Sequence, residues 1–394
     1  MQLLKNIFHL LEALFANVLY VFPSTSIKVV GVTGTDGKTT TTHAIYHILK
    51  ESGKNVSMVS TVYAQIGNKT METGFHTTTP RASTVFNYLK QATKAGSEYF
   101  ILETTSHALS QNRVHGIRFE AAVLTNITQE HAMEHKSFEE YVKVKARLLL
   151  QSKHPIINLD ADIYQTVKEI LTTNRKTYTS FSLKNTEANI IWNKDIKTDI
   201  SDDFNRENIL GAYACCVLLG IEKEKAGRAL SSFTLPKGRL DIVHEDDFMV
   251  IIDFAHTPNA IFNVLQEIRK NYLKTGGRII HVFGSASERD DVKRPMMGEA
   301  SAKFADTIIL TEEDHRNEDV QDICKQIAKG IGSSKPYFTE PDRAKAIEWA
   351  IQMAKKNDIV VLTGKSHEKS LARNGKEYPW DEYKAVENAV GSRK

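Results

Sequence analysis

The sequence predicts an α/β fold, with a mostly parallel sheet in a first domain and a Rossmann-like arrangement of strands and helices in a second. Three observations predict it. A glycine-rich loop joins a strand-like run to a helical run within residues 27–53, strand-like and helical runs alternate beyond residue 248, and turn residues at 234–241 separate the two parts. A chain of 394 residues is long enough for at least two domains.

Residues 1–22 predict an amphipathic helix, because apolar side chains recur at positions 3, 4, 7, 8, 11, 14, 15, 18 and 19. Glu12 and Asn17 interrupt this stripe, so the segment is too polar to span a membrane, and it lacks the basic start and the cleavage site of a signal peptide. We expect the helix to dock on the body of the protein or on a partner protein. A helix lying on a membrane surface and a cleaved segment are the alternatives.

The stretch 27–42, IKVVGVTGTDGKTTTT, has the pattern of a phosphate-binding loop between a buried strand and a helix. Gly34 and Gly37 let the backbone approach a phosphate closely, and the free N–H groups at the start of the following helix face it. Lys38 would lie along the β- and γ-phosphates of a nucleotide, and Thr39 would hold Mg²⁺. The strict pattern has glycine where this chain has Val32, with a glycine one place earlier. A glycine turn that merely joins strand and helix is the alternative.

Two further residues follow strand-like runs of the first domain. Glu103 ends the run 98–103, and His131 comes shortly after the run 121–126. Parallel strands end at one edge of a sheet, so we expect both side chains near the phosphate loop, where a carboxylate binds magnesium directly or through water. A structural hydrogen bond is the alternative for the histidine.

Two polar segments of the first domain complete its pattern. The loop FHTTTPRAS either offers hydroxyl groups to a ligand or is an ordinary Thr-Pro loop. The polar stretch 172–206 predicts a β excursion at the surface.

Beyond residue 248, strand-like runs at 248–253, 278–283, 306–311 and 358–364 alternate with helical runs. The loops at their carboxyl ends are polar and include Asp253 and His256, so this edge of the sheet predicts a binding face, although surface loops are generally polar. The loop GSASERDDVKRP lacks GxGxxG spacing, and the second domain therefore has no dinucleotide fingerprint.

The composition is that of an ordinary globular protein, with 41% hydrophobic and 25% charged residues. A net charge of +3 is too small to indicate a nucleic-acid partner. The three cysteines are too few for a disulfide framework, which is typical of a reducing compartment and predicts a cytoplasmic location.

With these motifs assembled, the chain resembles the Mur ligase family, most closely its MurE branch, which adds the third amino acid to the UDP-muramyl-dipeptide precursor of peptidoglycan. The motifs that carry the resemblance follow in the family's order: GTDGKTT at 34–40, TTTP at 77–80, ETTSHALSQNRVHG at 103–116, TNITQEHAMEHKSFEEYVKVK at 125–145, KGRLD at 237–241, DFAHTP at 253–258, ERDDVKRP at 288–295 and GKSHE at 364–368. The resemblance implies three parts: the N-terminal helix at 1–26, a central P-loop ATPase domain at 27–235 and a C-terminal Rossmann-like domain at 236–394.

The resemblance also implies functions for individual residues. The ATP-binding positions are Gly34, Thr35, Asp36, Gly37, Lys38, Thr39, Thr40, Asn208, Arg239 and Asp253, with Asn208 at the adenine, Asp253 at the ribose and Arg239 near the phosphates. The magnesium positions are Thr39, Glu103, His131 and Lys145, the last once it is carbamylated. The positions for the muramyl-peptide acceptor are Thr78, Thr79, Ser106, Gln111 and Arg113, and those for the incoming amino acid are Arg316, Gly364 and Glu368. Lys38, Lys145, His131 and Arg239 are expected to act in catalysis.

The chemistry that the resemblance implies is amide-bond formation driven by ATP and Mg²⁺. A carboxylate of the acceptor attacks the γ-phosphate to give an acyl phosphate, and the amino group of an amino acid then displaces phosphate. Closure of the C-terminal domain is expected to exclude water from the acyl phosphate. A related enzyme acting on another acceptor, as folylpolyglutamate synthases and cell-wall amidating ligases do, is the first alternative. A nucleotide-binding scaffold without turnover is the second.

The chain departs from the family's pattern in two places. The family begins with a separate domain that grips the uridine nucleotide, and here only residues 1–26 precede the first strand, so we expect that domain to be absent. The substrate would then be held differently or with a partner's help, or the acceptor would lack the UDP-sugar. The amino-acid-selecting motif, DNPR in diaminopimelate-adding members, is EDHR at 313–316. Arg316 could pair with a carboxylate, whereas Asp314 adds negative charge.

Overall fold

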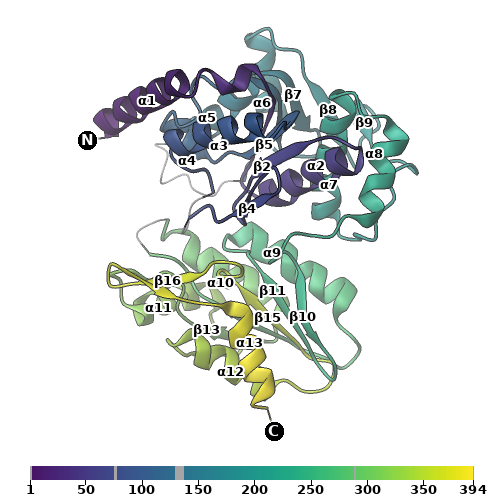
Figure 1. Cartoon of the computed structure of the whole chain (residues 1–394). Coiled ribbons are helices and arrows are strands. Elements are labelled where there is room, and N and C mark those ends of the chain that lie inside the picture. The colour runs from purple at the N-terminus through teal and green to yellow at the C-terminus, as the bar shows by residue number, and fades with distance from the viewer. Residues whose placement is uncertain (1, 75–77, 129–136, 288–289, 394) are drawn as a thin grey trace. The chain divides into compact units, whose positions relative to one another are not determined.

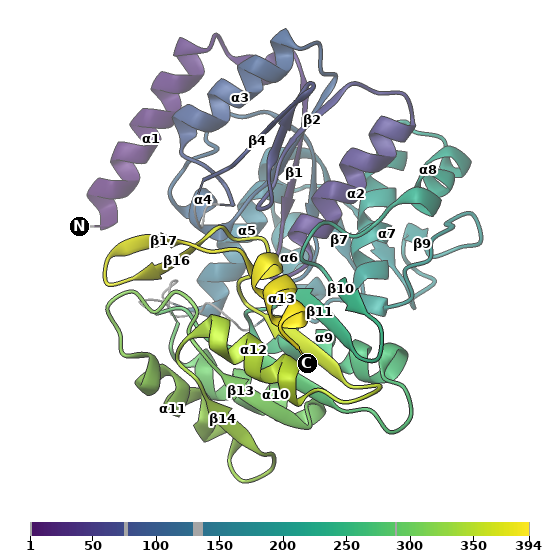
Figure 2. The same cartoon turned by 60° about the horizontal axis from the view of Figure 1, so that its bottom comes forward.

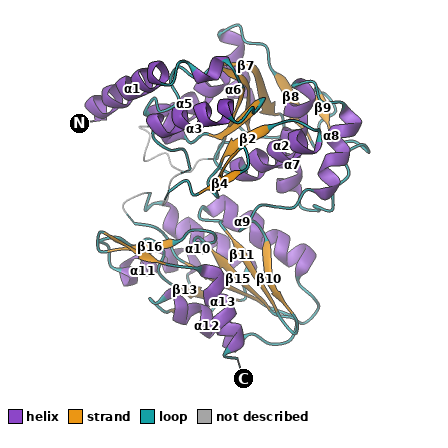
Figure 3. Cartoon of the chain, viewed as in Figure 1, coloured by secondary structure: helices purple, strands orange, loops and turns teal. Residues whose placement is uncertain are grey.

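A computed structural model describes residues 2–74, 78–128, 137–287 and 290–393 of the chain (Figure 1). The chain divides into two compact units, Met1–Pro236 and Lys237–Lys394. Helices and strands alternate along much of both units, each of which is built on its own large sheet (Figure 3). The predicted α/β class is therefore confirmed.

The first unit is built on a nine-stranded sheet with the order β4-β3-β2-β5-β1-β6-β7-β8-β9. Its strands are β1 Lys28–Thr33, β2 Val56–Val59, β3 Ala64–Ile66, β4 Lys69–Met71, β5 Tyr99–Glu103, β6 Phe119–Leu124, β7 Ser152–Asn158, β8 Thr179–Ser182 and β9 Ile190–Ile191. All neighbours are parallel except β2-β3 and β3-β4, which form antiparallel pairs. The central position of β1 places the end of that strand, and so the predicted phosphate loop, at the middle of the sheet edge.

Two apolar cores cover the two faces of this sheet. One face is covered by α1 Gln2–Leu19, α3 Ala82–Lys94, α5 Phe138–Gln151 and α6 Tyr164–Thr173, and the other by α2 Lys38–Glu51, α7 Asp203–Leu218 and α8 Lys223–Ala229. The short helix α4 Ser106–Ser110 and the 3₁₀ turns η1 Pro23–Thr25 and η2 Leu230–Ser232 complete the unit. Successive side chains of β1 alternate between the two cores, as the pleat of a strand requires.

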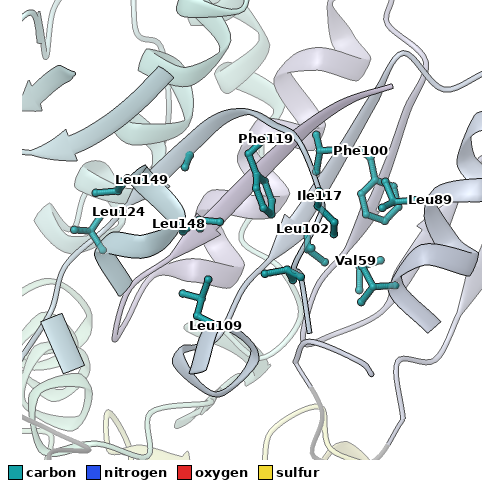
Figure 4. Packing of buried hydrophobic residues seen from close by; sticks show 14 of the residues in the cluster. Val59, Leu89, Phe100, Leu102, Leu109, Ile117, Phe119, Leu124, Leu148 and Leu149 are labelled. Atoms are coloured by element: carbon teal, nitrogen blue, oxygen red, sulfur yellow. The ribbon is translucent and has the colours of Figure 1, made fainter. Parts of the chain in front are cut away.

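Close packing explains why position 31 is a glycine, which the phosphate-loop pattern does not explain. A Cβ atom at this position of β1 would lie 2.9 Å from Cδ1 of Leu148 and 3.1 Å from Cδ1 of Phe119. Figure 4 shows Leu148 and Phe119 among the buried side chains of this core. Glycine therefore allows α5 to pack closely on the strand that carries the phosphate loop.

The structure differs from the sequence predictions in three segments of this sheet. The sequence 56–67, VSMVSTVYAQIG, predicts a single strand-like run. The structure has two strands there, because the Ser60 hydroxyl accepts the N–H groups of Val62 and Tyr63 and so turns the chain between β2 and β3. The stretch 172–206 contains strands and lies largely at the surface, as predicted, but it is not a separate excursion, since β8 and β9 extend the same parallel sheet and Phe181 is buried. Strand β7 escaped prediction, since Pro155 lies in its middle, and proline is uncommon in an inner strand.

The second unit is built on a six-stranded sheet with the order β10-β11-β15-β12-β13-β14, parallel except for the β10-β11 pair. Its strands are β10 Asp241–Glu245, β11 Met249–Asp253, β12 Ile279–Phe283, β13 Thr307–Leu310, β14 Tyr337–Thr339 and β15 Ile359–Thr363, and a separate hairpin is formed by β16 Ser370–Arg373 and β17 Lys376–Pro379. The helices are α9 Pro258–Glu267, α10 Lys293–Phe304, α11 Val320–Ile331, α12 Arg343–Met353 and α13 Glu382–Gly391, and α9 ends in the π-helical turn η3 Ile268–Tyr272. The four predicted strands β11, β12, β13 and β15 are confirmed.

A buried arginine joins several elements of this unit. The guanidinium of Arg343 at the start of α12 donates to the Glu382 carboxylate of α13 (Nε–Oε2 2.9 Å) and to the carbonyl of Thr363 at the end of β15 (2.8 Å). Both ionic side chains are fully buried, so each depends on the other for its solvation. This pair fixes α12 and α13 against the carboxyl edge of the sheet.

His281 in β12 makes the stability of the second unit depend on pH. Its ring bonds to the hydroxyls of Ser301 (2.8 Å) and Thr363 (3.0 Å), and burial, with the nearby charge of Arg343, lowers its pKa to about 3. The unfolded histidine binds a proton below about pH 6.5 and the folded one does not, so the free energy of unfolding falls as pH drops from 6.5 towards 3. We expect His281 to lower the free energy of unfolding by about 2 kcal/mol between pH 7 and pH 5.

Urea unfolding at pH 7 and pH 5 measures that contribution. His281→Gln should be less stable than the wild type at pH 7 yet lose less stability on acidification, because the glutamine does not titrate. An unchanged pH dependence in this variant would contradict the assignment.

No helix among the residues that the structure describes is long and apolar enough to cross a membrane. Cys215, Cys216 and Cys324 are free and buried.

Candidate active site

The loop 34–37 joins β1 to α2 in the geometry that a phosphate cradle requires. Gly34 has φ +154° and Gly37 has φ +80°, backbone conformations that favour glycine. Helix α2 begins at Lys38, so the N–H groups of its first turn and the positive end of its dipole face the loop. Residues Thr35, Asp36 and Thr40, predicted to line the same site, lie in the loop or in this first turn.

Side chains from distant segments fill the space where the two glycines lack a Cβ atom. A Cβ at Gly34 would lie 1.8 Å from the Thr125 hydroxyl, and one at Gly37 would lie 1.9 Å from Oδ1 of Asn208. Asn126 accepts the N–H of Asp36 through Oδ1 (3.0 Å), and the Thr125 hydroxyl donates to the carbonyl of Asp36 (2.6 Å). The loop is therefore held in shape by its neighbours as well as by its glycines.

Lys38 and Thr39 point back to the loop and to the sheet edge respectively. The Lys38 ammonium donates to the carbonyl of Thr35 (2.7 Å), across the mouth of the loop. The Thr39 hydroxyl donates to Oε1 of Glu103 (3.0 Å), which lies at the end of the neighbouring strand β5. The sequence-based expectation that Glu103 lies near the phosphate loop is therefore met by the geometry.

Glu103 is the centre of a buried network. Besides Thr39, its carboxylate accepts the Thr61 hydroxyl (2.9 Å) and the Thr61 backbone N–H (2.8 Å), and the side chain is 1% exposed. The Thr61 hydroxyl also lies 3.0 Å from the Thr78 hydroxyl. The network thus links the phosphate loop to the predicted acceptor-binding loop.

The predicted acceptor residues converge on the same edge of the sheet. The Thr79 hydroxyl donates to the carbonyl of Glu103 (2.9 Å), and the carbonyl of Thr79 accepts Nη1 of Arg113 (2.8 Å). Nε of Arg113 donates to Gln111 (2.9 Å), and burial lowers the pKa of Arg113. Ser106 lies at the start of α4 and is buried. The residues Thr79, Arg113 and Gln111 therefore form one hydrogen-bonded group beside Glu103.

Lys145 reaches the phosphate loop from α5. Its ammonium donates to the carbonyl of Gly34 (2.6 Å) and lies over the Tyr141 ring at 4.7 Å. Burial first, and the positive charge of Lys38 second, lower the pKa of Lys145 well below its usual range. A buried lysine of lowered pKa offers the neutral amine that a reaction with carbon dioxide requires.

In the second unit, hydrogen bonds to Asp253 connect the loop before β10 to the loop after β11. Its Oδ2 accepts the N–H of Leu240 and its Oδ1 accepts the N–H of Ala255, both at 2.7 Å. The Arg239 guanidinium lies over the Phe254 ring at 4.9 Å, and its Nη1 donates to the carbonyl of Gly238 (3.0 Å). Asp253 and Arg239 thus lie together, with the Asp253 carboxylate bonded to backbone as well.

The loops after β13 and β15 bring four ionisable residues together. The Lys365 ammonium bridges Asp314 (2.9 Å) and Glu368 (2.6 Å), and although burial acts to lower the pKa of Lys365, the two carboxylates raise it. Glu313 is buried, and burial raises its pKa. Its Oε2 has no hydrogen-bond partner among the described residues, and a Cβ at Gly364 would lie 2.8 Å from that atom.

Arg316 lies beside this acidic group. The backbone of Arg316 has a φ of +46°. Its N–H donates to the carbonyl of Ala372 (2.9 Å), and its guanidinium donates to the carbonyl of Ser287. The structure therefore brings Arg316, Gly364 and Glu368 to one edge of the second sheet, together with Glu313 and Asp314.

Several contacts of the first unit were missed by sequence reasoning. Thr61 carries no signal in the sequence, since the surrounding run 56–67 has the pattern of a strand. Thr125 and Asn126 were seen only as the end of a strand, although the TNIT motif of the resemblance contains both. The Tyr141 hydroxyl lies 3.2 Å from that of Thr35 and was not predicted either. His131 lies outside the described residues.

The residues around Thr39 fit a magnesium ion. Mg²⁺ prefers oxygen ligands, and the Thr39 hydroxyl and the Glu103 carboxylate meet beside the phosphate loop. Within the described ranges, no group of three or more His, Cys, Asp or Glu side chains has an arrangement that could hold a metal ion by itself. Magnesium ions at such sites use few carboxylates and complete their coordination with phosphate oxygens and water.

Comparison with protein families gives two matches. Residues 32–215 match the Mur ligase middle domain, and residues 238–366 match the Mur ligase, glutamate ligase domain. The chain is 38% identical over 385 residues to a UDP-N-acetylmuramoyl-L-alanyl-D-glutamate--2,6-diaminopimelate ligase of Aquifex aeolicus, covering 94% of this chain and 78% of the relative. It is 35% identical over 407 residues to a UDP-N-acetylmuramyl-tripeptide synthetase of Borreliella afzelii, covering 95% and 79%.

Solved structures agree with these matches. A UDP-N-acetylmuramoyl-L-alanyl-D-glutamate--2,6-diaminopimelate ligase superposes with a TM-score of 0.60 at 27% identity, over 93% of this chain and 78% of that chain. A folylpolyglutamate synthase of Mycobacterium tuberculosis, complexed with ADP and AMPPCP, has a TM-score of 0.72 at 12% identity over 92% and 97% of the two chains, a likeness of fold. Because two Mur ligase domains match in order and relatives above 30% identity are matched over most of their length, the chain belongs to the Mur ligase family.

Proposed function

We propose that this chain is an ATP-dependent ligase that joins an amino acid to a carboxylate of a muramyl-peptide acceptor, in the synthesis of a peptidoglycan precursor. The observation that carries the proposal is the contact between Thr39 at the start of α2 and Glu103 at the end of β5, directly beside the loop 34–37. It joins a phosphate cradle, a hydroxyl and a carboxylate in one place. ATP and Mg²⁺ are the cofactors that this arrangement suits.

The reaction has two steps. An oxygen of the acceptor carboxylate attacks the γ-phosphorus of ATP, and ADP leaves as the acyl phosphate forms. The amino nitrogen then attacks the acyl carbon, phosphate leaves, and the nitrogen loses a proton as the amide forms. Bound Mg²⁺ supplies positive charge to the phosphate oxygens, and Lys38 and the N-terminus of α2 supply more.

The first unit supplies groups for the acceptor next to this charge. Thr78, Thr79, Gln111 and Arg113 belong to the hydrogen-bonded network around Glu103, and Ser106 lies at the start of α4. We assign these residues to the acceptor because Arg113 provides a cation for its carboxylates and Thr78, whose hydroxyl accepts from Thr61, provides a hydroxyl donor. The relatives' names specify a UDP-N-acetylmuramoyl-L-alanyl-D-glutamate acceptor, which we propose for this chain as well.

Lys145 is assigned to the metal site as a carbamate. Carbamylation would replace an ammonium near Lys38 by a carboxylate, which removes a repulsion and adds an oxygen ligand for a second magnesium ion. His131 is assigned to the same metal site from the family motif. Asn208, which lies against Gly37, is assigned to the adenine, and Asp253 and Arg239 to the ribose and phosphates.

The amino acid is assigned to the edge of the second sheet that carries Arg316, Gly364 and Glu368. Arg316 would pair with a carboxylate of the amino acid, and Glu313, Asp314 and Glu368 would favour an additional amino group. An amino acid with two amino groups and at least one carboxylate fits this combination. Diaminopimelate, named in the relatives, is one such compound. We place the reaction in the cytoplasm, in keeping with the three reduced cysteines.

Phosphate release from ATP tests the proposal. The purified chain is incubated with Mg²⁺, ATP, an acceptor panel that includes UDP-N-acetylmuramoyl-L-alanyl-D-glutamate and a folate, and a panel of amino acids. We expect phosphate release that depends on both acceptor and amino acid, with mass spectrometry of the products identifying the amide. Nucleotide binding without turnover under every combination would instead favour a non-catalytic scaffold.

Lys38→Ala is the variant that ties turnover to the phosphate loop. Because it removes a positive charge from the γ-phosphate in the transition state, we expect amino-acid-dependent phosphate release to fall by about 10³-fold. Lys50→Ala, at the far end of the same helix, is the matched control and should leave the rate unchanged. Equal rates for Lys38→Ala and the wild type would rule out this loop as the site of ATP turnover.

A further inference from the structure

The N-terminal helix α1 has one face docked on the first unit and an opposite face of large apolar side chains. The docked face is made of small or polar residues: Ala13, Ala16 and Asn17 are buried, and Glu12 accepts the hydroxyl of Ser83 in α3 (2.8 Å). Helix α1 lies along α3 (Figures 1 and 2). These contacts fix the orientation of the helix about its own axis, so the opposite face points away from the unit.

That opposite face is unusually apolar for a protein surface. We call it the outer face of α1 and define it as Ile7, Phe8, Leu11, Leu14, Phe15 and Val18, whose exposed fractions range from 43% to 69%. Three more large apolar residues are exposed where the helix ends, namely Leu19, Val21 and Phe22. At about half of ~200 Å² each, the nine side chains expose roughly 900 Å², more than the largest apolar patch of a typical monomer.

The spacing of the outer face is that of a helix-pairing seam. Ile7, Leu11, Leu14 and Val18 are separated by four, three and four residues, which is the a/d spacing of a coiled coil, and Phe8 and Phe15 flank the seam one heptad apart. A seam of this kind packs against another helix. It spans most of α1, whose 18 residues correspond to a length of about 27 Å.

Charge argues against a lipid surface as the occupant. Helices that lie on membranes carry lysines and arginines on the polar side, whereas α1 has one lysine and one glutamate, and the glutamate is bonded to α3. An uncharged seam also gives no repulsion between identical copies. The outer face alone exposes roughly 600 Å² by the same estimate, and together with Leu19, Val21 and Phe22 the exposed apolar area is close to the ~800 Å² that each partner buries in a standard stable interface.

We propose that the outer face of α1 pairs with the same face of α1 in a second copy of this chain, giving a two-fold symmetric dimer. In a two-fold symmetric contact the same surface of both copies meets, so that surface must be complementary to itself. A neutral apolar seam meets this requirement. The contact involves the first unit alone and is independent of the proposed ligase activity.

Sedimentation velocity of the full chain, at 1 to 50 μM, tests the proposal. We expect the wild type to sediment as a dimer. Leu11→Glu with Phe15→Glu should raise the dimer dissociation constant at least 100-fold, because it places charges in the buried seam. Ile191→Glu changes an exposed apolar residue elsewhere on the first unit and should leave the dimer intact. Far-UV circular dichroism spectra that match the wild type will show that neither variant acts through folding, since all three side chains are exposed.

A cross-linking measurement locates the contact. The native cysteines are buried, so a cysteine introduced as Leu11→Cys is accessible to a bis-maleimide, and the cross-linked product should have the dimer mass. Ile191→Cys should stay monomeric under the same treatment. A wild type that is monomeric at 50 μM overturns the proposal. Co-sedimentation of monomers with phosphatidylglycerol and phosphatidylethanolamine vesicles, lost in the Leu11→Glu and Phe15→Glu variant, would assign the face to lipid instead.

Discussion

Replacement of Glu103 by glutamine is expected to lower amino-acid-dependent phosphate release by about 10³-fold, the size of effect seen when a charge-stabilising group is removed from an active site. The substitution keeps the size of the side chain and removes the negative charge that we assign to magnesium. Titration of the rate with Mg²⁺ should show that the variant needs at least about ten times more metal for half-maximal activity, because a neutral amide is a weaker ligand for a hard cation.

A measurement of stability and the control variant Thr61→Ser separate the loss of metal binding from a loss of structure in this experiment. In Glu103→Gln an NH₂ group replaces one carboxylate oxygen. This group cannot accept the backbone N–H of Thr61, so we expect the free energy of unfolding to fall by about 1–3 kcal/mol. Thr61→Ser retains the hydroxyl and the backbone contact to Glu103, and it should retain most of the activity. If Glu103→Gln is folded and turns over within tenfold of the wild type, the carboxylate does not hold the metal.

The parts of this site that could be predicted from sequence are those set by local rules. The loop 34–37 was recognisable because a strand, two glycines and GKT occur within a few residues, and the pattern fixes where Lys38 and Thr39 stand. Glu103 was predicted from a topological rule, since β5 and β1 are parallel neighbours and their carboxyl ends coincide. Neither prediction needed knowledge of side-chain packing.

The parts that escaped prediction depend on packing between distant segments. Thr125 packs against Gly34 and Asn208 against Gly37, about 90 and 170 residues away in the chain, and no local pattern marks such a fit. Asn208 was expected near ATP from the resemblance, but its packing against the loop was not. The break between β2 and β3 depends on one serine hydroxyl that captures two backbone N–H groups, and the run 56–67 is otherwise strand-like. That break places Thr61 against Glu103.

The polar residues of the second unit show a further limit. Asp253 follows a strand at the sheet edge, as a ligand-binding carboxylate would, and sequence reasoning did not foresee that both of its oxygens accept backbone N–H groups. A strand-end position indicates where a carboxylate lies, but the partner that it takes depends on the loops around it. Hydrogen bonds to backbone also stabilise the ionised form, so the two functions are compatible.

Replacement of Lys145 by alanine is expected to lower phosphate release by about 10²- to 10³-fold, if the carbamate holds a magnesium ion as proposed. Part of the activity should return on addition of acetate or propionate, because a small carboxylate can enter the space left by the side chain and replace the carbamate. Lys145→Arg keeps a positive charge but cannot form a stable carbamate, and it should be inactive and insensitive to these acids.

Direct observation of the modification completes this test. With ¹³C-bicarbonate, the wild type should show one carbamate signal in the carbon NMR spectrum that is missing from Lys145→Arg. The buried amine makes this reaction favourable, since the lowered pKa of Lys145 leaves more of the neutral, nucleophilic form at neutral pH. A Lys145→Arg variant that retains wild-type turnover would show that the lysine acts as a cation through its bond to the Gly34 carbonyl, and the second magnesium ion would then need another ligand.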